Sequence, residues 1–174
     1  MKITQAYLKQ RLHYNPETGV FTWLPRSIKH YRDKIWNARY AGKLAGCTAI
    51  NVHPPYHHIG IDYKNYNAHR LAFLYMTGIL PLNDIDHING NTLDNRWNNL
   101  HEASRSENCA NGGPPKNNTS GYRGVSFNRD IGKYHAYITL QYKRRHFGFF
   151  DSLQEAALAY KKAARKYFGE FARL

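Results

Sequence analysis

Apolar residues in the first part of the chain change their spacing every few positions, which predicts short elements. Ile3, Leu8 and Leu12 have a weak helical spacing, so we expect a helix at the start. The run NPETG at 15–19 consists of turn-forming residues, and VFTW at 20–23 has the aromatic and β-branched residues of a strand. The chain therefore opens with a predicted helix, turn and strand.

The segment that follows predicts a sheet and a second helix. HHIGIDY at 57–63 alternates apolar and polar residues, which indicates a strand, and we place the tight turn to its partner strand at 64–65. Helical spacing resumes at about His69, and Gly78 is the expected end of that helix.

The segment 84–100, DIDHINGNTLDNRWNNL, is rich in acids and amides. Residues 85–88 predict a strand, and the Asn89-Gly90 dipeptide is a strong turn signal. A second short strand follows, and the S-x-x-E pattern at 104–107 is a capping box that opens a helix with Asn108 in its first turns. We therefore expect a strand, an amide-rich loop, a strand and a helix.

The C-terminal part of the chain predicts a sheet backed by a helix. Three runs rich in aromatic and β-branched residues, 121–128, 133–140 and 144–150, predict a three-stranded antiparallel sheet. A capping box at 152–155 opens an amphipathic helix, which Gly169 ends. The predicted fold class is α+β, with two modules.

Charge points to the kind of partner. Lysine and arginine number 25 against 12 acids, so the formal net charge is +13 and the sequence pI is about 9.8. An excess of this size favours a polyanion, and we expect double-stranded DNA as the partner. No apolar run approaches the roughly 18 residues of a membrane span, and no signal-peptide core is present, so we expect a cytoplasmic protein with no membrane and no obligatory protein partner. Cys47 and Cys109 lack zinc-site spacing and are expected to be reduced thiols.

The acid-rich segment has three interpretations. An EF-hand calcium loop fails, because aligning Gly90 with the required glycine puts Ile85 at the first ligand position and Arg96 where the bidentate glutamate belongs. The residues could also be turn formers only. The third interpretation is phosphodiester hydrolysis, which needs a hard divalent cation and a base for the attacking water.

Under this third interpretation, the chemistry can be assigned to residues. Asp86 offers a carboxylate and Asn108 an amide oxygen, which suit Mg²⁺ or Mn²⁺. His87 is the candidate general base, and Asn99 either holds the histidine ring or braces the loop.

The segment from Asp86 to Asn91, with 94–96, 99–100 and Asn108, resembles the HNH endonucleases of ββα-metal fold, in particular the phage and intron-encoded homing endonucleases. The run AHRL at 68–71 also matches that family's pattern. The resemblance implies His87 as general base, Asp86 and Asn108 as metal ligands and Asn99 as the structural middle asparagine. Many members have a histidine where Asn108 stands. The family's zinc-binding cysteines are absent, so no structural zinc is expected and the N-terminal elements must give that support.

The C-terminal module resembles the Apetala2-type DNA-binding domain, through SGYRGV at 120–125, YHAYI at 134–138, FGFF at 147–150 and the EAA-x-AY helix. The resemblance implies DNA binding by the open face of the sheet. Tyr134 stands where the family usually has tryptophan, so base preference is not carried over. The expected DNA-binding residues are Arg123, Arg129, Tyr134, Lys143, Arg144 and Arg145.

These observations define the expected domains and function. We expect an N-terminal basic extension at 1–55, an HNH nuclease core at 56–112, a linker at 113–119 and an Apetala2-like domain at 120–174. The basic residues from Arg26 to Arg39 either line a DNA groove or lie on a solvated connector. His69 and Arg96 are possible accessory residues: His69 is either at the site or structural, and Arg96 either clamps a phosphate or pairs with Asp94.

The sequence thus predicts a metal-dependent HNH homing endonuclease. We expect it to leave 5′-phosphate and 3′-hydroxyl ends inside a bacterial host. The rival functions are a DNA-binding regulator without nuclease activity, and a less specific HNH nuclease or restriction enzyme.

Overall fold

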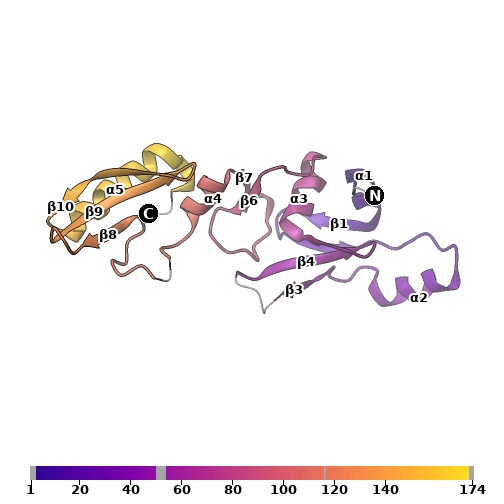
Figure 1. Ribbon diagram of the computed structural model, residues 1–174. Coiled ribbons are helices and arrows are strands. Elements are labelled where there is room, and N and C mark those ends of the chain that lie inside the picture. The colour runs from indigo at the N-terminus through magenta and orange to yellow at the C-terminus, as the bar shows by residue number, and fades with distance from the viewer. Residues whose placement is uncertain (1–2, 50–53, 116, 173–174) are drawn as a thin grey trace. The chain divides into compact units, whose positions relative to one another are not determined.

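A computed structural model of the chain describes residues 3–49, 54–115 and 117–172. The chain divides into two compact units, residues 1–102 and 103–174; in the described residues the first combines several small sheets with helices and the second combines one sheet with helices (Figure 1). The predicted α+β class, with a final three-stranded sheet packed on one helix, is confirmed. Lys116 of the predicted linker and residues 1–2 and 50–53 of the predicted N-terminal extension lie outside the described residues.

The described residues of the first unit form two small sheets, a two-stranded β6–β7 pair and three α-helices. Its elements are α1 Gln5–Arg11, β1 Leu12–Asn15, β2 Val20–Trp23, α2 Tyr31–Tyr40, β3 Cys47–Ala49, β4 Tyr56–Ile61, β5 Lys64–Asn67, α3 Ala68–Thr77, β6 Asp84–His87, the 3-10 turn η1 Trp97–Asn99 and β7 Leu100–Ala103. The strand β7 ends at the boundary between the units.

The core of the first unit gathers residues that are far apart in the sequence. Burying their apolar surface is the main force that holds these short elements together. The largest buried side chains are Leu8, Leu12, Tyr14, Phe21, Ile59, Leu71 and Leu74. Tyr14 and Phe21 stack across the β1–β2 hairpin at 4.6 Å between ring centroids. The predicted opening helix and the strand at 20–23 are confirmed, and β1 is an additional strand.

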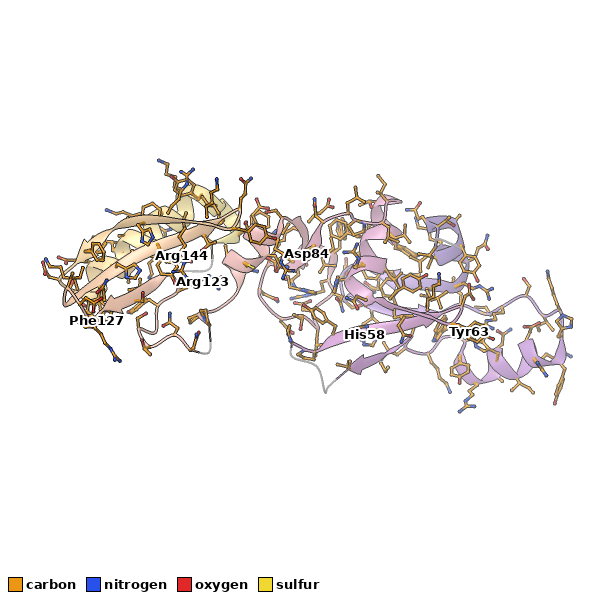
Figure 2. All side chains as sticks on the ribbon, viewed as in Figure 1. His58, Tyr63, Asp84, Arg123, Phe127 and Arg144 are labelled. Atoms are coloured by element: carbon orange, nitrogen blue, oxygen red, sulfur yellow. The ribbon has the colours of Figure 1, made fainter. Side chains whose placement is uncertain are left out.

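The β4–β5 turn corrects the predicted register. The turn residues are Asp62 and Tyr63, both with positive φ, whereas residues 64–65 lie in β5. This register buries Ile59 and Ile61 and leaves Tyr63 fully exposed at the hairpin tip (Figure 2). The predicted turn at 64–65 is wrong, because the burial of two isoleucines outweighs the local turn preference. The helix that follows begins one residue before His69 and ends at Gly78, which has φ +81°.

The second unit is a sheet covered by one long helix, with a shorter helix beside it. Its elements are α4 Arg105–Asn111, β8 Val125–Asn128, β9 Lys133–Leu140, β10 Lys143–Phe150, α5 Leu153–Phe168 and the 3-10 turn η2 Gly169–Phe171. The strand order is β10-β9-β8 and both pairings are antiparallel. Both predicted capping boxes are present, at Ser104 with Glu107 and at Ser152 with Glu155.

The first strand of this sheet starts later than predicted because of Gly124. This residue has φ +65°, and a Cβ there would lie 2.4 Å from the Tyr137 carbonyl oxygen and from the Tyr160 ring. The chain therefore turns at Gly124, whose carbonyl accepts a hydrogen bond from the Tyr137 N–H at 2.8 Å, and β8 begins at Val125. The small residues Ala136, Ala156 and Ala164 let α5 pack closely on the sheet.

Candidate active site

Strand β6 ends with a buried acid and a buried histidine. Asp86 is 7% exposed and His87 is 3% exposed. One oxygen of the Asp86 carboxylate accepts a hydrogen bond from the His87 backbone N–H at 2.9 Å. The other lies 3.2 Å from Nε2 of His101 on the paired strand β7. Ionisable side chains rarely occupy such buried positions without a specific purpose.

The His87 ring is held by an amide and by a second histidine. Its Nε2 lies 3.3 Å from Oδ1 of Asn95. An amide oxygen only accepts, so with this amide orientation Nε2 carries the proton and Nδ1 carries the lone pair of the neutral ring. His69 packs edge-on against His87, with 5.2 Å between centroids and planes at 89°. Burial lowers the pKa of His87 below its usual value.

His69 lies in α3 between two aromatic rings. Its ring is 5.3 Å from that of Tyr56 and 5.2 Å from that of His87. Burial, with the positive potential of His87, Arg70 and His58, lowers the pKa of His69 to about 3. The side chain is therefore neutral at physiological pH and supports the ring of His87.

Asn99 braces the loop. Its Oδ1 accepts from the Asn89 backbone N–H at 3.0 Å, and its Nδ2 donates to Asn89 Oδ1 at 3.1 Å and to the Asp94 carbonyl at 2.8 Å. Of the two roles left open for Asn99, the structure supports bracing, whereas the hydrogen bond to the histidine ring comes from Asn95.

The N-terminal β1–β2 hairpin contacts the loop residues next to His87. The Tyr14 hydroxyl donates to the Asn95 carbonyl at 2.7 Å, and the Trp97 N–H donates to the Pro16 carbonyl at 2.9 Å. A Cβ at Gly19 would lie 2.4 Å from the Asn95 carbonyl carbon. The β1–β2 hairpin therefore fixes the loop by direct backbone contact, as expected for a chain without stabilising zinc cysteines.

Arg96 pairs with Asp94 on the same loop. Arg96 Nε and Nη2 donate to the two carboxylate oxygens at 2.8 Å and 2.6 Å. These bonds lower the pKa of Asp94 to about 2. The Arg96 side chain is 48% exposed, so pairing does not preclude contact with a phosphate, and the accessory role stays a prediction.

Asn108, the predicted second metal ligand, lies in α4 of the second unit. Its backbone N–H donates to the Ser104 carbonyl at 2.9 Å, as the predicted capping arrangement requires, and its side chain is partly exposed. In the described part of the chain, no three His, Cys, Asp or Glu side chains are grouped to hold a metal ion. Any metal held here would rely on amide, water or phosphate oxygens besides Asp86.

Two strand residues of the C-terminal sheet differ from the prediction, and the predicted open-face residues Arg123 and Arg129 lie outside the strands. Tyr134 packs with the helix-side core, because it shares the parity of the buried residues Ala136 and Ile138 on β9. Arg145 pairs with Ile138 and lies over the Tyr167 ring of α5 at 5.5 Å. The predicted open-face position of Tyr134 is wrong, and Arg145 also lies on the helix side.

Arg123 serves the connection into the sheet. Its Nη1 donates to the carbonyls of Gly112 and Gly113 at 2.8 Å and 2.6 Å. Arg144, labelled with Arg123 in Figure 2, is exposed and lies over the Tyr137 ring at 4.8 Å. Arg129 is exposed in the β8–β9 turn, and Lys143 is exposed at the start of β10.

An aromatic and basic cluster occupies the open face of the sheet. His135 stacks near Tyr137, His146 and Phe149, with centroid distances of 5.3, 5.7 and 5.8 Å. With Arg144, these four residues form what we call the open-face cluster. The cluster lies on β9 and β10 on the face opposite to the core, and a bulge between His146 and Phe149 places Phe149 beside His135 on this face.

Sequence reasoning missed Asn95, His101 and the open-face histidines. Asn95 lies within the quoted motif, but only the fold shows that it contacts His87. Pairing the predicted strand at 85–88 with the one after the loop would have brought His101 toward Asp86, so a signal for it was present.

Two comparisons with known proteins found a match to this chain. A model of the HNH endonuclease family matches residues 66–110. The chain is 37% identical over 112 residues to Protein 3.8 of Escherichia phage T7, covering 64% of this chain and 92% of that protein. No solved structure matches the chain significantly.

The described helices include none with the length and apolar character to cross a membrane.

The HNH match covers the buried Asp86–His87 pair, Asn99 and Asn108. An HNH domain is a nuclease domain that acts on DNA, so the predicted nuclease class is supported. The chain belongs to the family of phage T7 Protein 3.8 and contains an HNH endonuclease domain at residues 66–110.

Proposed function

We propose that the protein is a metal-dependent HNH homing endonuclease that cuts double-stranded DNA and leaves 5′-phosphate and 3′-hydroxyl ends. The observation that carries this proposal is the buried Asp86–His87 pair, inside the matched HNH segment, with the His87 ring held by Asn95. A carboxylate and an imidazole placed together at the end of a strand provide a metal ligand and a base, which phosphodiester hydrolysis needs.

The donor set fits a hard divalent cation. Asp86 and Asn108 would hold one Mg²⁺ or Mn²⁺ ion, because carboxylate and amide oxygens are the ligands these ions prefer. With one carboxylate, most of the ion's charge stays available, and the remaining positions suit water and phosphate oxygens. When bound, such an ion stabilises the negative charge that develops on the phosphate.

Residues of the protein accept the proton of the attacking water and orient the side chains of the site. His87 accepts a proton from the attacking water at Nδ1, because Nε2 donates to Asn95. Asn95 and His69 hold the ring in position, and Asn99 keeps the loop closed around the site. His101 contacts the Asp86 carboxylate and orients it.

A plasmid cleavage assay tests the enzyme proposal. Supercoiled plasmid should be cut in Mg²⁺ or Mn²⁺ and left intact in EDTA. His87→Ala should abolish cutting and leave DNA binding near wild type, whereas His13→Ala, at an exposed position of β1, should do neither. No cutting by the wild type with any divalent ion would leave the regulator as the better reading, and loss of binding in His87→Ala would make the histidine structural.

Specificity separates the homing enzyme from its rival within the nuclease class. A homing endonuclease concentrates cleavage at one site in a long substrate, whereas a less specific HNH nuclease or a restriction enzyme cuts at many. The phage relative supports action in the cytoplasm of an infected bacterium. The proposed domains are an N-terminal extension at 1–55, a nuclease core at 56–112, a linker at 113–119 and a DNA-binding domain at 120–174.

We also propose that residues 120–174 bind DNA as an Apetala2-like domain, through the open-face cluster. A two- or three-stranded surface with aromatic and basic side chains can enter a major groove. Neighbouring arginines on β10 give a matched test, because Arg144 is on the open face and Arg145 is on the helix side. Arg144→Ala should weaken binding and lower the salt slope by about 0.9, whereas Arg145→Ala should leave the slope unchanged. Equal effects would refute binding by this face.

A further inference from the structure

The nuclease unit carries a second basic surface on residues 26–43, which we call the basic arm. It includes α2 and its flanking connections, and Figure 1 shows α2 projecting from the edge of its unit. The arm has six lysines and arginines against one acid, Asp33, so it contributes net +5 of the formal +13. No residue of α2 is buried. Neither the proposed active site nor the C-terminal sheet uses this surface.

One side of α2 attaches it to the unit. Trp36 packs edge-on against Trp23 at 5.5 Å, and the Arg26 guanidinium stacks over Trp36 at 3.8 Å. The Asn37 side chain forms two 2.8 Å hydrogen bonds with the backbone N–H and carbonyl of Arg26. These contacts hold the helix in a defined orientation, although none of its residues enters the core.

The opposite side of α2 has the pattern of a groove-binding helix. Tyr31, Ile35 and Ala38 follow at helical spacing and face away from Trp36, and Tyr31 and Ile35 are 76% and 52% exposed. At 100° per residue, Lys34 lies on one flank of this strip and Arg32 and Arg39 lie on the other. All three basic side chains are exposed.

The charge of the arm is not neutralised within the protein. The single acid, Asp33, accepts from the backbone N–H groups of Lys29 and His30 at 3.0 and 2.9 Å, and these bonds lower its pKa. Among the residues that the structure describes, no ion pair includes an arm residue, and the buried Nε of Arg26 has no hydrogen-bond partner. The arm therefore presents unpaired positive charge to solvent.

We propose that α2 is a second DNA-binding element, which docks in the major groove of duplex DNA; this inference rests on the proposed nuclease function. A helix about 10–12 Å across fits a groove about 12 Å wide. Tyr31 and Ile35 then face the base edges, where apolar groups contact thymine methyls, and the basic flanks reach phosphates on both sides.

The charge and size of the arm favour DNA over two other occupants. A second copy of the chain would bring two +5 surfaces together, which is repulsive. A membrane surface requires a larger apolar face than the three residues of this strip.

The salt dependence of DNA binding tests the proposal. The full chain is titrated with a fluorescent random-sequence duplex in EDTA, over a series of NaCl concentrations. Each neutralised phosphate contributes about 0.9 to the slope of log K against log salt, so Arg32→Gln/Lys34→Gln/Arg39→Gln should lower the slope by about 2.7. If the variant and the wild type bind equally at 1 M salt, this difference in slope makes the variant up to about 500-fold weaker than the wild type at 0.1 M salt. The charge-preserving Arg32→Lys/Arg39→Lys should keep the wild-type slope.

A variant with the same charge change on another helix provides the control. Lys162→Gln/Arg165→Gln/Lys166→Gln removes three exposed charges from α5 and should leave the slope unchanged. Equal slopes for the two triple variants would overturn the proposal. It would also be overturned if the wild type sedimented as a dimer that the arm variant dissociates, or if the arm bound anionic vesicles as tightly as duplex DNA. The plasmid assay keeps the two proposals separate, because a wild type that cuts nothing refutes the nuclease while the salt slope still reports on the arm.

Discussion

The buried histidine of α3 makes the nuclease unit sensitive to acid. His69 is 6% exposed, and burial lowers its pKa to about 3 from an ordinary value of about 6.5. The unfolded chain therefore binds a proton at a pH where the folded chain does not. The contribution of this residue to stability is complete above pH 6.5 and is lost progressively as the pH falls toward 3.

The size of the effect follows from the pKa difference. Each pH unit between the two pKa values changes the free energy of unfolding by about 1.36 kcal/mol, so protonation of His69 should destabilise the unit by about 2 kcal/mol at pH 5 and by about 4 kcal/mol at pH 3. His69→Phe keeps a ring against Tyr56 and His87 and removes the titration. Between pH 7 and pH 5, the free energy of unfolding of this variant should fall by about 2 kcal/mol less than that of the wild type.

Urea unfolding followed by tryptophan fluorescence is the suitable assay. The three tryptophans, Trp23, Trp36 and Trp97, all belong to the first unit, so the signal reports on that unit alone. His13→Gln, at an exposed position, should keep the wild-type acid dependence. Equal loss of stability in wild type and His69→Phe between pH 7 and pH 5 would refute the reasoning.

Three further predictions concern the loop that holds His87, the proposed general base. Gly19→Ala adds a Cβ 2.4 Å from the Asn95 backbone at a φ of +73°, and should lower the free energy of unfolding in urea by about 2 to 5 kcal/mol. The control Gly42→Ala has a similar φ of +76° but no atom within 4 Å of the new Cβ, so it should lower the free energy of unfolding by only about 1–2 kcal/mol. Tyr14→Phe leaves the buried Asn95 carbonyl without its donor, and should cost about 1–3 kcal/mol in the same assay. Asn95→Ala removes the acceptor of His87 Nε2, and should slow plasmid cleavage by about 10- to 100-fold with DNA binding unchanged; unchanged cleavage would remove Asn95 from the site.

Elements specified by local chemistry were predictable from the sequence. The helices that begin at Arg105 and Leu153 follow capping boxes whose reciprocal hydrogen bonds involve residues three positions apart. Gly78 ends α3 because it adopts the left-handed conformation that glycine tolerates. Such signals need no knowledge of the rest of the chain.

The turn of the β4–β5 hairpin was not predictable in the same way. Asp62 and Tyr63 both have positive φ, and neither is a glycine, asparagine or proline. The register of this hairpin follows from burial of the flanking strand, whereas the turn at 141–142 lies between the two strands predicted at 133–140 and 144–150. In β9, by contrast, the information was present, because Tyr134 has the same parity as Ala136 and Ile138 and must share their face.

In the candidate site too, residues with a local sequence signal were predictable, whereas residues brought together only by folding were not. Asp86 and His87 are neighbours in one strand, so a local motif identifies them. Asn95 and His101 meet them only after the loop folds and β6 pairs with β7. A sequence pattern therefore finds the groups proposed to carry the chemistry more readily than the groups that contact and orient them.

The N-terminal hairpin explains how a site with one central carboxylate keeps its shape. The loop contains polar residues that have no apolar core of their own, so its position must come from outside. Tyr14, Pro16 and Gly19 provide it through a side-chain hydrogen bond, a backbone hydrogen bond and a backbone contact that excludes even a methyl group. All three act on residues 95–97, next to the amide that orients His87. A tether of this kind adds no charge to the site, so the hairpin stabilises the loop and leaves the electrostatics of the site to Asp86 and to the metal ion that we propose it holds.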